Sequence, residues 1–433
     1  MTRDQSRSAV GHNVETMASA ADTTRRGALP TLPFTALSPT EVFAVEDTTA
    51  QFTWRGLPDG PLRLNVHHRS GTQPLEIGAA GDSGAADVDG FAAGTGTAVD
   101  VEVDGQPITR HLVTTLGALD GPPIAKIATI SDLHLGADGF GLIRQLREPN
   151  GVEPYPLRCA KAAVREAQAW GAELLVIKGD ITELGMPAEW DLFDELLDDV
   201  HIPILAVPGN HDTFAKRGSL DATTELRRRG LFPAPVYATD IGGATIVMAD
   251  STVPGNSYGR LGQWTEQLVQ AVDCEQPAFI FTHHHLEPWR YPHIWPPGIR
   301  KFDTRDLLPA LFEANPDLVI SSGHTHRNRA YRHATGLVTE VSATKDYPGV
   351  WAGYTIHASA VRQVVRRVAE PTCAAWNDRT HAVVGGIWGR WSPGSISDRS
   401  LNHAWTRTYP AVDAAGQVTT SVDSQPTSGS API

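Results

Sequence analysis

Cysteine is scarce in this chain, which has three in 433 residues: Cys159, Cys274 and Cys373. None of them forms a CxxC pair or another close spacing. Disulfide frameworks and thiolate zinc sites need cysteines at short spacings, so we expect neither kind of site. A reducing compartment fits this usage best, and we expect the protein to be cytoplasmic.

Long apolar runs are also missing. No stretch approaches the roughly 20 apolar residues that a membrane-spanning helix needs, so we expect no membrane span. The first 27 residues are polar and charged and include no apolar core of a secretory signal peptide. Arg25 and Arg26 form a twin arginine, but Gly, Pro and Thr interrupt the sequence after them, which disfavours a twin-arginine signal.

Positive charge is in the minority. The 36 Lys and Arg residues face 49 Asp and Glu residues, which leaves a formal charge of −13, and the basic residues form no obvious cluster. A nucleic-acid backbone is bound by clustered Lys and Arg, so we expect no nucleic-acid polymer as a partner. The negative net charge does not exclude a small anionic substrate, because one local cationic centre can hold it.

The remaining composition, with 41% apolar residues and 11 tryptophans, is that of a folded protein with a main domain and additions. Short alternating runs separated by Gly, Asp and Pro turns predict strands before Gly121, although the Gly/Ala/Asp-rich stretch 78–97 is expected to be mostly loop.

We expect a disordered arm at 1–30, a small β-sandwich of the fibronectin III type at 31–120, an α/β domain at 121–369, a Trp-rich extension at 370–411 and a flexible tail at 412–433.

The α/β domain is predicted by six apolar, strand-like runs that alternate with amphipathic, helix-like ones. The strand-like runs are 124–131, 172–179, 202–209, 244–251, 278–283 and 317–323. Continuous apolar strands separated by amphipathic helices indicate sheets that helices cover.

Five of the six runs end in candidate metal ligands. The motifs are DLH at 132–134, GD at 179–180, GNHD at 209–212, HHH at 283–285 and GHTH at 323–326. Ligands of open α/β sheets bind beyond the carboxyl ends of the strands. Each motif alone is more often a turn or a surface histidine. Turn chemistry does not explain all five at strand ends, so together they predict a metal site.

The residue types indicate the kind of metal. Carboxylate and imidazole suit Fe, Mn or Zn, and cysteine is not needed. The candidate ligands outnumber what one ion requires. Two ions about 3.5–4 Å apart, sharing one carboxylate, would use them all and leave room for a bridging hydroxide. The pattern therefore predicts a two-metal hydrolase.

The series DxH, GD, GNHD, H and GHxH resembles the calcineurin-like metallophosphoesterase superfamily over about residues 124–365. The resemblance implies a four-layer αββα core after the small β-sandwich. It also implies that two sets of residues hold the ions: Asp132, His134 and His326 for the first, Asn210, His283 and His324 for the second, with Asp180 bridging. His211 would be a non-ligand histidine that assists the leaving group, and Asp212 would orient it.

The mechanism expected from this set is an in-line attack of the bridging hydroxide on phosphorus, with both ions neutralising phosphate oxygens. His211 would help the alkoxide to leave. In the triple histidine, His283 is our choice of ligand. His284 is the alternative ligand or a neighbour of one, and we expect His285 in the pocket wall or at the surface.

Within the superfamily, GDITELG at 179–185 lacks the Arg of the serine/threonine protein phosphatases, and Glu183 stands where purple acid phosphatases have a metal-bound Tyr. The text around ISDLHLG and VPGNHD is similar to class III cyclic-nucleotide phosphodiesterases and bacterial glycerophosphodiesterases. The similarity implies a small phosphodiester substrate, including 3′,5′-cyclic nucleotides. The alternatives are a phosphomonoesterase on the same site and an inactive scaffold, which the complete motif set disfavours.

Two further segments bear on substrate. The first is the stretch after the triple histidine, which has two interpretations. In one, it binds substrate, with an anion meeting Arg290, Arg300 and Lys301 and a base stacking on Trp289, Tyr291 or Trp295. In the other, it is a rigid loop that covers the site. The segment around Trp376, Trp388 and Trp391 is expected to pack in the core. Its alternatives are a lid and a contact between the two copies of a homodimer.

Overall fold

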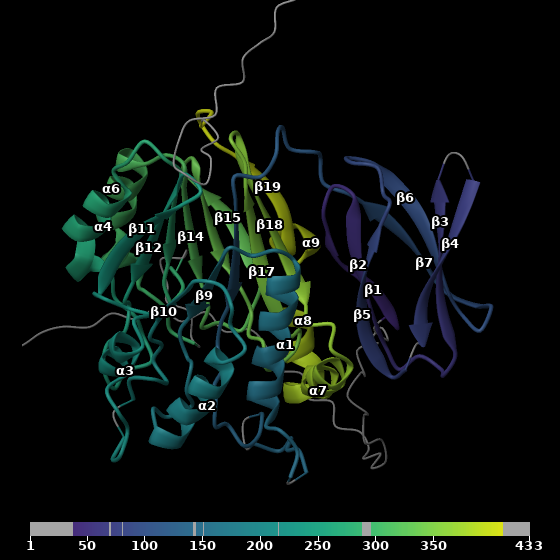
Figure 1. Cartoon of the computed structure of the whole chain (residues 1–433), viewed down its shortest axis with the longest axis horizontal. Helices are drawn as coiled ribbons and strands as arrows, with labels where there is room; N and C mark the ends of the chain where they lie inside the picture. Colours follow the sequence, from purple (N-terminus) through teal and green to yellow (C-terminus); the bar gives the residue numbers. More distant parts are fainter. Residues whose placement is uncertain are drawn as a thin grey trace, which may run out of the picture. The chain divides into compact units, whose positions relative to one another are not determined.

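Two six-stranded β-sheets form the centre of this protein, whose structure is a computed structural model (Figure 1). The structure describes residues 38–68, 71–79, 81–141, 144–149, 151–214, 216–287 and 296–409. The expected arm at 1–30 and tail at 412–433 lie outside these residues. All described helices and strands belong to one compact unit that begins at Pro39.

The first sheet has the strand order β10-β9-β8-β17-β18-β19, in which β10, β9 and β8 are parallel and the others antiparallel. Its strands are β8 (Ala125–Ile130), β9 (Leu174–Lys178), β10 (Ile204–Val207), β17 (Val350–Ile356), β18 (Ala360–Arg367) and β19 (Ser400–Ala404). Edge strand β19 comes from the C-terminal segment, where the sequence analysis predicted no strand.

The second sheet has the order β11-β12-β13-β14-β16-β15, with β12, β13, β14 and β16 parallel and antiparallel strands at both edges. Its strands are β11 (Val236–Ile241), β12 (Ala244–Ala249), β13 (Ala278–Phe281), β14 (Leu318–Ser322), β15 (Arg329–His333) and β16 (Gly336–Glu340). All six strand-like runs predicted after residue 121 are strands of these two sheets.

Alternation along the strands packs the sheets face to face. In β13, Phe279 and Phe281 belong to the core shared with the first sheet, and their rings lie 5.9 and 6.0 Å from that of Tyr354 in β17. The intervening Ile280 faces the opposite way, into a second core under the helices. Because side chains alternate between the faces of a strand, continuous apolar runs bury both faces of each sheet.

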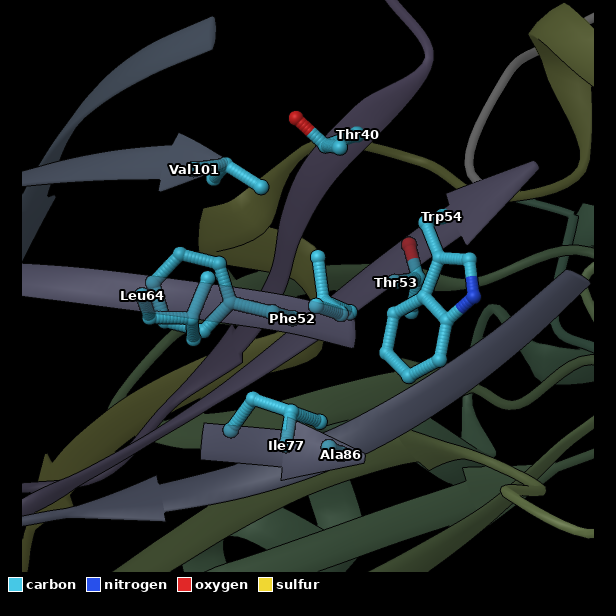
Figure 2. A pocket seen from close by; sticks show the side chains of 9 residues that line it. Thr40, Phe52, Thr53, Trp54, Leu64, Ile77, Ala86 and Val101 are labelled. Atoms are coloured by element: carbon cyan, nitrogen blue, oxygen red, sulfur yellow. The ribbon is translucent and has the colours of Figure 1, made fainter. Parts of the chain in front are cut away.

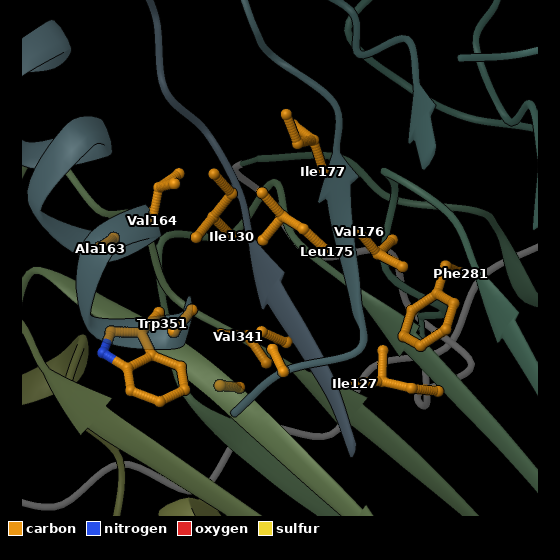
Figure 3. Close-up of a cluster of buried hydrophobic side chains, with 14 of the residues drawn as sticks. Ile127, Ile130, Ala163, Val164, Leu175, Val176, Ile177, Phe281, Val341 and Trp351 are labelled. Atoms are coloured by element: carbon orange, nitrogen blue, oxygen red, sulfur yellow. The ribbon is translucent and has the colours of Figure 1, made fainter. Parts of the chain in front are cut away.

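Helices cover the outer faces, which gives the α/β/β/α layering. The helical segments are α1 (Tyr155–Ala169), α2 (Pro187–Leu197), α3 (Ala222–Arg228), η1 (Gly262–Trp264), α4 (Thr265–Val272), α5 (Lys301–Thr304), α6 (Leu307–Ala314), α7 (Pro371–His381), η2 (Val383–Gly386), α8 (Ile387–Trp391) and α9 (Ile396–Arg399). Helix α1 packs on β8 and β17, and α4 on β11 and β12. Figure 3 shows Val164 of α1 on one side of β9 and Phe281 on the other. None of the described helices is both long and apolar enough to cross a bilayer.

The N-terminal β-region consists of two small antiparallel sheets, ordered β1-β2-β5 and β4-β3-β6-β7. Their strands are β1 (Thr40–Val45), β2 (Thr49–Arg55), β3 (Pro61–His68), β4 (Gly71–Ala79), β5 (Ser83–Asp89), β6 (Gly96–Val103) and β7 (Gln106–Thr114). Alternate residues of β2, β3 and β6 form their shared core. Figure 2 shows a hollow beside Phe52, Leu64 and Val101, but its volume of about 10 Å³ marks it as a packing gap rather than a ligand site.

The prediction that residues 78–97 are mostly loop is wrong, because β5 lies within this stretch and the end of β4 and the start of β6 also fall in it. Strand β5 pairs with β2 over its whole length, and Trp54 stands opposite Gly84. A Cβ atom at Gly84 would overlap the Trp54 ring. The small residues that resembled a loop are those that let a neighbouring strand present a large aromatic ring, so tertiary packing overrides composition.

A reciprocal hydrogen bond joins the N-terminal β-region to the first central sheet. Gln51 Nε2 donates to the carbonyl oxygen of Arg367 at 3.1 Å, and Gln51 Oε1 accepts from the Arg367 N–H at 2.7 Å. Both residues are buried. A buried backbone group that loses its partner costs about 1–3 kcal/mol.

We therefore expect Gln51→Ala to lower the free energy of unfolding by about 1–3 kcal/mol, measured by urea denaturation. Gln73→Ala is the matched control, because the Gln73 side chain is exposed and has no hydrogen bond among the described residues. Equal stability of the two variants would contradict the role given to Gln51.

Candidate metal centre

The seven candidate ligands come together where parallel strands of both sheets end. Among the described residues, four groups of Asp and His side chains have ligand atoms within 4.8 Å of one another: Asp132 with His134 and His326, Asp132 with Asp180 and His283, His134 with Asp180 and His211, and His283 with His284 and His324. The strands that precede the seven candidate ligands are β8, β9, β10, β13 and β14. The fold therefore gathers side chains that are up to 194 positions apart along the chain, since the outermost are Asp132 and His326.

Asp180 lies between two sets of ligands. Its Oδ2 atom is 3.5 Å from His134 Nε2, and its Oδ1 atom is 3.4 Å from His283 Nε2. On the side of His134, Asp132 Oδ1 is 3.5 Å from His326 Nε2. One buried carboxylate thus faces one imidazole of each set.

The second set is built around His283. Its Nε2 atom is 3.1 Å from Asn210 Oδ1 and 3.2 Å from His324 Nδ1. Asn210, His283 and His324 are all buried. Three ligand atoms of different residues therefore converge on one point beside Asp180.

The backbone is unusual at five of the seven positions. Asp132, His134, Asp180, His324 and His326 all have φ between 48° and 69°, the left-handed region that residues other than Gly seldom adopt. Each such residue costs about 1–3 kcal/mol and persists where the surrounding structure requires it. These five residues leave their strands by a sharp turn that presents the side chain at the sheet edge.

Hydrogen bonds orient each imidazole ring through the nitrogen that faces away from the cluster. His134 Nδ1 lies 2.8 Å from Glu183 Oε2, His326 Nδ1 lies 2.8 Å from Asp346 Oδ2, and His283 Nδ1 lies 2.8 Å from the carbonyl oxygen of Lys178. Such partners make the outer nitrogen the proton donor and leave Nε2 as a lone pair for a metal. In His324 the arrangement is reversed, because Nε2 lies 3.1 Å from the Pro297 carbonyl oxygen and Nδ1 faces His283.

A cation fits this cluster. His134 Nε2 is buried and has no hydrogen-bond partner among the described residues, although Asp180 is close to it. Burial lowers the pKa of His134 to about 4, so its imidazole is neutral at physiological pH, the form that binds a metal. Asp132 and Asp180 are buried carboxylates, which need compensating positive charge. The donor set suits divalent or trivalent metal ions.

Burial would raise the pKa of Asp180, but the neighbouring His283 outweighs it and holds the pKa well below its usual range. Conversely, Asp180 overcomes the effect of burial on His283 and raises the pKa of that imidazole to about 9. Each group of this pair thus favours the charged form of the other. A metal ion held here would also compensate the charge of Asp180.

The geometry favours His283 over His284 as the candidate ligand. His284 Nδ1 is 2.8 Å from the Ser251 hydroxyl, and the backbone N–H of His284 donates to the same oxygen at 3.2 Å. His284 shares a cluster with His283 and His324, whereas His283 also reaches Asp180 and Asn210. His285 is buried as well, which differs from the surface position that was one of its two expected places.

His211 lies beside the cluster, and its ring centroid is 4.3 Å from that of His134. Its Nδ1 atom donates to the Glu183 carbonyl oxygen at 3.0 Å, and its backbone N–H donates to Asp180 Oδ1 at 2.8 Å. The His211 side chain is 27% exposed, which is more than any of the four candidate ligand histidines. His211 can therefore meet a ligand in the cavity.

Asp212 does not have the contact expected of it. Its carboxylate accepts hydrogen bonds from the backbone N–H groups of Ile181, Thr182 and Gly209 and from the Thr182 hydroxyl, at 2.6–3.1 Å. Among the described hydrogen bonds it has none to His211. Asp212 thus ties the loop after β10 to the loop that follows Asp180, and its expected role in orienting His211 stays a prediction.

A cavity of about 450 Å³ opens onto the cluster. Its wall includes His134, Asp180, Asn210, His211, His324 and His326, together with two cationic residues, Arg144 and Lys345. Burial opposes the charge of Lys345, but Asp346 outweighs it and raises the pKa of the amine. The cavity thus combines candidate metal ligands with positive charge, an arrangement suited to a phosphate group.

The cation positions differ from the expectation. Residues 289–291 and 295 lie outside the described residues, so the prediction for Trp289, Arg290, Tyr291 and Trp295 cannot be placed. Arg300 and Lys301 are exposed and absent from the described cavity wall, and Arg300 lies over the Tyr258 ring. The cationic residues in the described cavity wall are Arg144 and Lys345.

Sequence reasoning did not identify the orienting residues Glu183, Asp346 and Lys345. Glu183 was noted only as the replacement for a tyrosine, and its position three residues after Asp180 is the signal that could have revealed it. Asp346 and Lys345 lie in a connection between β16 and β17 that has no motif. Their contacts depend on how that connection packs.

Close packing at Gly323 leads to a test of the cluster. A Cβ atom at this position would overlap Ser131 Oγ and lie 2.6 Å from Asp132 Oδ2. We expect Gly323→Ala to displace Asp132 and to lower the metal content of the purified protein at least several-fold, measured by elemental analysis. In the control, Gly117→Ala, the added Cβ meets no atom within 4 Å, so metal content should be unchanged. Full metal content in a folded Gly323→Ala protein would contradict this geometry.

Comparisons with known proteins agree with the site. Residues 125–328 match the family model described as calcineurin-like phosphoesterase. The chain is 28% identical over 226 residues to a probable cyclic nucleotide phosphodiesterase of Synechococcus, an alignment that covers 49% of this chain and 77% of that protein. It is 32% identical over 180 residues to a glycerophosphodiester phosphodiesterase of Enterobacter lignolyticus, covering 40% of this chain and 62% of that one.

Among solved structures, a purple acid phosphatase from yellow lupin seeds is 13% identical, with a TM-score of 0.41, and the alignment covers 76% of this chain and 72% of that one. This likeness is too distant for a comparison of sites. The family match over 125–328 coincides with the strands that carry all seven candidate ligands. Residues 125–328 are therefore a domain of the calcineurin-like phosphoesterase family, and the chain is a phosphoric ester hydrolase.

Proposed function

We propose that the protein is a two-metal phosphodiesterase that hydrolyses small phosphodiesters, including 3′,5′-cyclic nucleotides. The observation that carries the proposal is the place of Asp180, a buried carboxylate with one oxygen toward His134 and the other toward His283. A carboxylate shared in this way is what two ions about 3.5–4 Å apart require.

The first ion would be held by Asp132, His134 and His326, and the second by Asn210, His283 and His324, with Asp180 shared by both. Metal ions in such a pair neutralise phosphate oxygens and lower the pKa of coordinated water, which supplies a nucleophile near neutral pH. Fe, Mn and Zn all fit these ligands.

His211 is proposed to donate a proton to the leaving group. Because its Nδ1–H is bonded to the Glu183 carbonyl oxygen, Nε2 is the nitrogen left for a substrate. The bond fixes the ring in the cavity wall beside His134. A positioned histidine of this kind contributes roughly 10²–10⁴-fold to a rate.

Two observations favour a diester substrate. Both curated relatives described above have names that specify phosphodiesters. The cavity of about 450 Å³ is in the size range that buries a drug-sized ligand, so it has room for a second ester group beside the phosphate. The proposed partner is therefore a small phosphodiester rather than a nucleic-acid polymer.

Phosphomonoesters are the second candidate substrates. Arg144 and Lys345 place two cations in the cavity wall, and these suit the additional negative charge of a monoester. Arg144 is bonded to Asp138 at 2.7 Å and Glu183 at 3.1 Å, and Lys345 to Asp346 at 3.0 Å. These carboxylates already offset most of that charge, so we rank the monoester second.

We expect kcat/KM for bis-p-nitrophenyl phosphate to exceed that for p-nitrophenyl phosphate by tenfold or more. Chelation should abolish both activities, and added Mn²⁺, Fe²⁺ or Zn²⁺ should restore them, because the nucleophile depends on the ions. Release of p-nitrophenolate measures all of these rates. A tenfold preference for the monoester would reject the diesterase, and activity that survives complete metal removal would reject the metal mechanism.

We expect His211→Ala to retain its metal ions and to lose about 100-fold or more in kcat on the diester, since the proton donor is removed. Metal content and rate are measured on the same preparation. His201→Ala, at an exposed position away from the cavity wall, is the control and should have the native rate. An unchanged rate in His211→Ala would refute the role of His211.

A further inference from the structure

The wall of this cavity also has an apolar part. Phe140 and Trp388 line it, with ring centroids 5.7 Å apart at an interplanar angle of 62°. Trp388 also approaches the cluster itself, because its ring centroid is 5.9 Å from that of His326. Phe214 and Val384 also line the cavity.

The C-terminal segment holds Trp388 in place. Trp388 lies in α8, well beyond the residues that match the family model. The N–H of Ser392 donates to the Trp388 carbonyl oxygen at 2.9 Å, and the N–H of Asn328 donates to the Ser392 carbonyl oxygen at 2.9 Å. Asn328 follows His326 by two residues. The loop that carries two candidate ligands is therefore bonded to the helix that carries Trp388.

The entry to α8 is strained. Val384 has φ 53° and ψ 43°, and the next two residues, Gly385 and Gly386, also have positive φ. A β-branched residue in the left-handed region is an outlier, and such strain clusters where a ligand is held. Val384 is also 44% exposed at the cavity, so burial of its own side chain does not account for the strain.

A positively charged side chain, Lys345, lies beside the ring of Phe140. Lys345 Nζ lies 5.0 Å from the centroid of Phe140 and is bonded to Asp346, the residue that orients His326. The cavity wall thus combines candidate ligands, a cation and two aromatic rings. A ligand that fits this combination of surfaces has an anionic phosphate and a flat apolar group.

We infer that Trp388 and Phe140 form a subsite that binds the planar, apolar ester group of the substrate, an aryl group or a nucleobase. The inference rests on the proposed metal-dependent phosphoester site and assigns specificity to a segment outside the family match. Flat rings bind well against an aromatic wall because stacking and edge contacts add to the burial of apolar area.

The test compares non-hydrolysable ligands of the metal-loaded protein by calorimetry. Phenylphosphonate and methylphosphonate differ only in the ring, and the phosphonate analogues of AMP and ribose 5-phosphate differ only in the base. We expect Trp388→Ala to weaken phenylphosphonate binding about tenfold, to leave methylphosphonate within twofold, and to retain its metal ions. Trp388→Phe should recover most of the affinity, because it retains a ring.

Ile387→Ala is the control for disturbance of α8, since Ile387 is 66% exposed and absent from the described cavity wall. Its affinities should equal those of the native protein. If Trp388→Ala weakens binding of phenylphosphonate but not of the AMP analogue, the subsite binds aryl groups. If it weakens binding of both, the subsite also binds nucleobases. Equal losses for phenylphosphonate and methylphosphonate, or no loss for any ligand, would overturn the inference. Because binding is measured without turnover, failure of the proposed diesterase activity is a separate result.

Discussion

The buried carboxylate of Asp180 is the constraint on which the rest of the site depends. An anion with 2% exposure is tolerated only beside compensating positive charge and hydrogen-bond donors. One of its oxygens accepts the His211 N–H, and both oxygens face imidazoles. Removal of these neighbours would leave an uncompensated charge between the sheets, so the sequence around Asp180 has little freedom.

That constraint extends into the backbone. Gly209 lies so close to Asp180 that a Cβ atom would overlap its N–H and carboxylate, and Gly179, at φ 82°, lies against His283. Asp212 then bonds the two loops together through three hydrogen bonds, from Ile181 and Thr182. The small residues let two strand ends approach, and the buried carboxylate holds them there. The left-handed residues are thus sustained by contacts on every side.

Much of this arrangement could be predicted from the sequence, because ligands at strand ends leave a local signal. DLH, GD, GNHD and GHTH each follow an apolar run, and all of those runs are strands. Strand β5 and the role of Asp346 could not be predicted, since both depend on partners far along the chain. The hydrogen bonds of Asp212 to Ile181 and Thr182 could not be predicted for the same reason, because they join two loops that are about 30 positions apart in the sequence.

The candidate ligands and the aromatic residues of the cavity wall have separate structural origins. The candidate ligands stand on turns that follow strands of two packed sheets, where backbone and side chains are fixed by burial. The aromatic wall instead comes from the loop that carries Phe140 and from the short helix α8, which rests on the site through the Asn328–Ser392 bond. Substitutions in these two segments change the shape of the cavity without touching Asp180 or its neighbours. Under the proposed assignment, phosphate chemistry and the choice of ester group therefore depend on different segments of the chain.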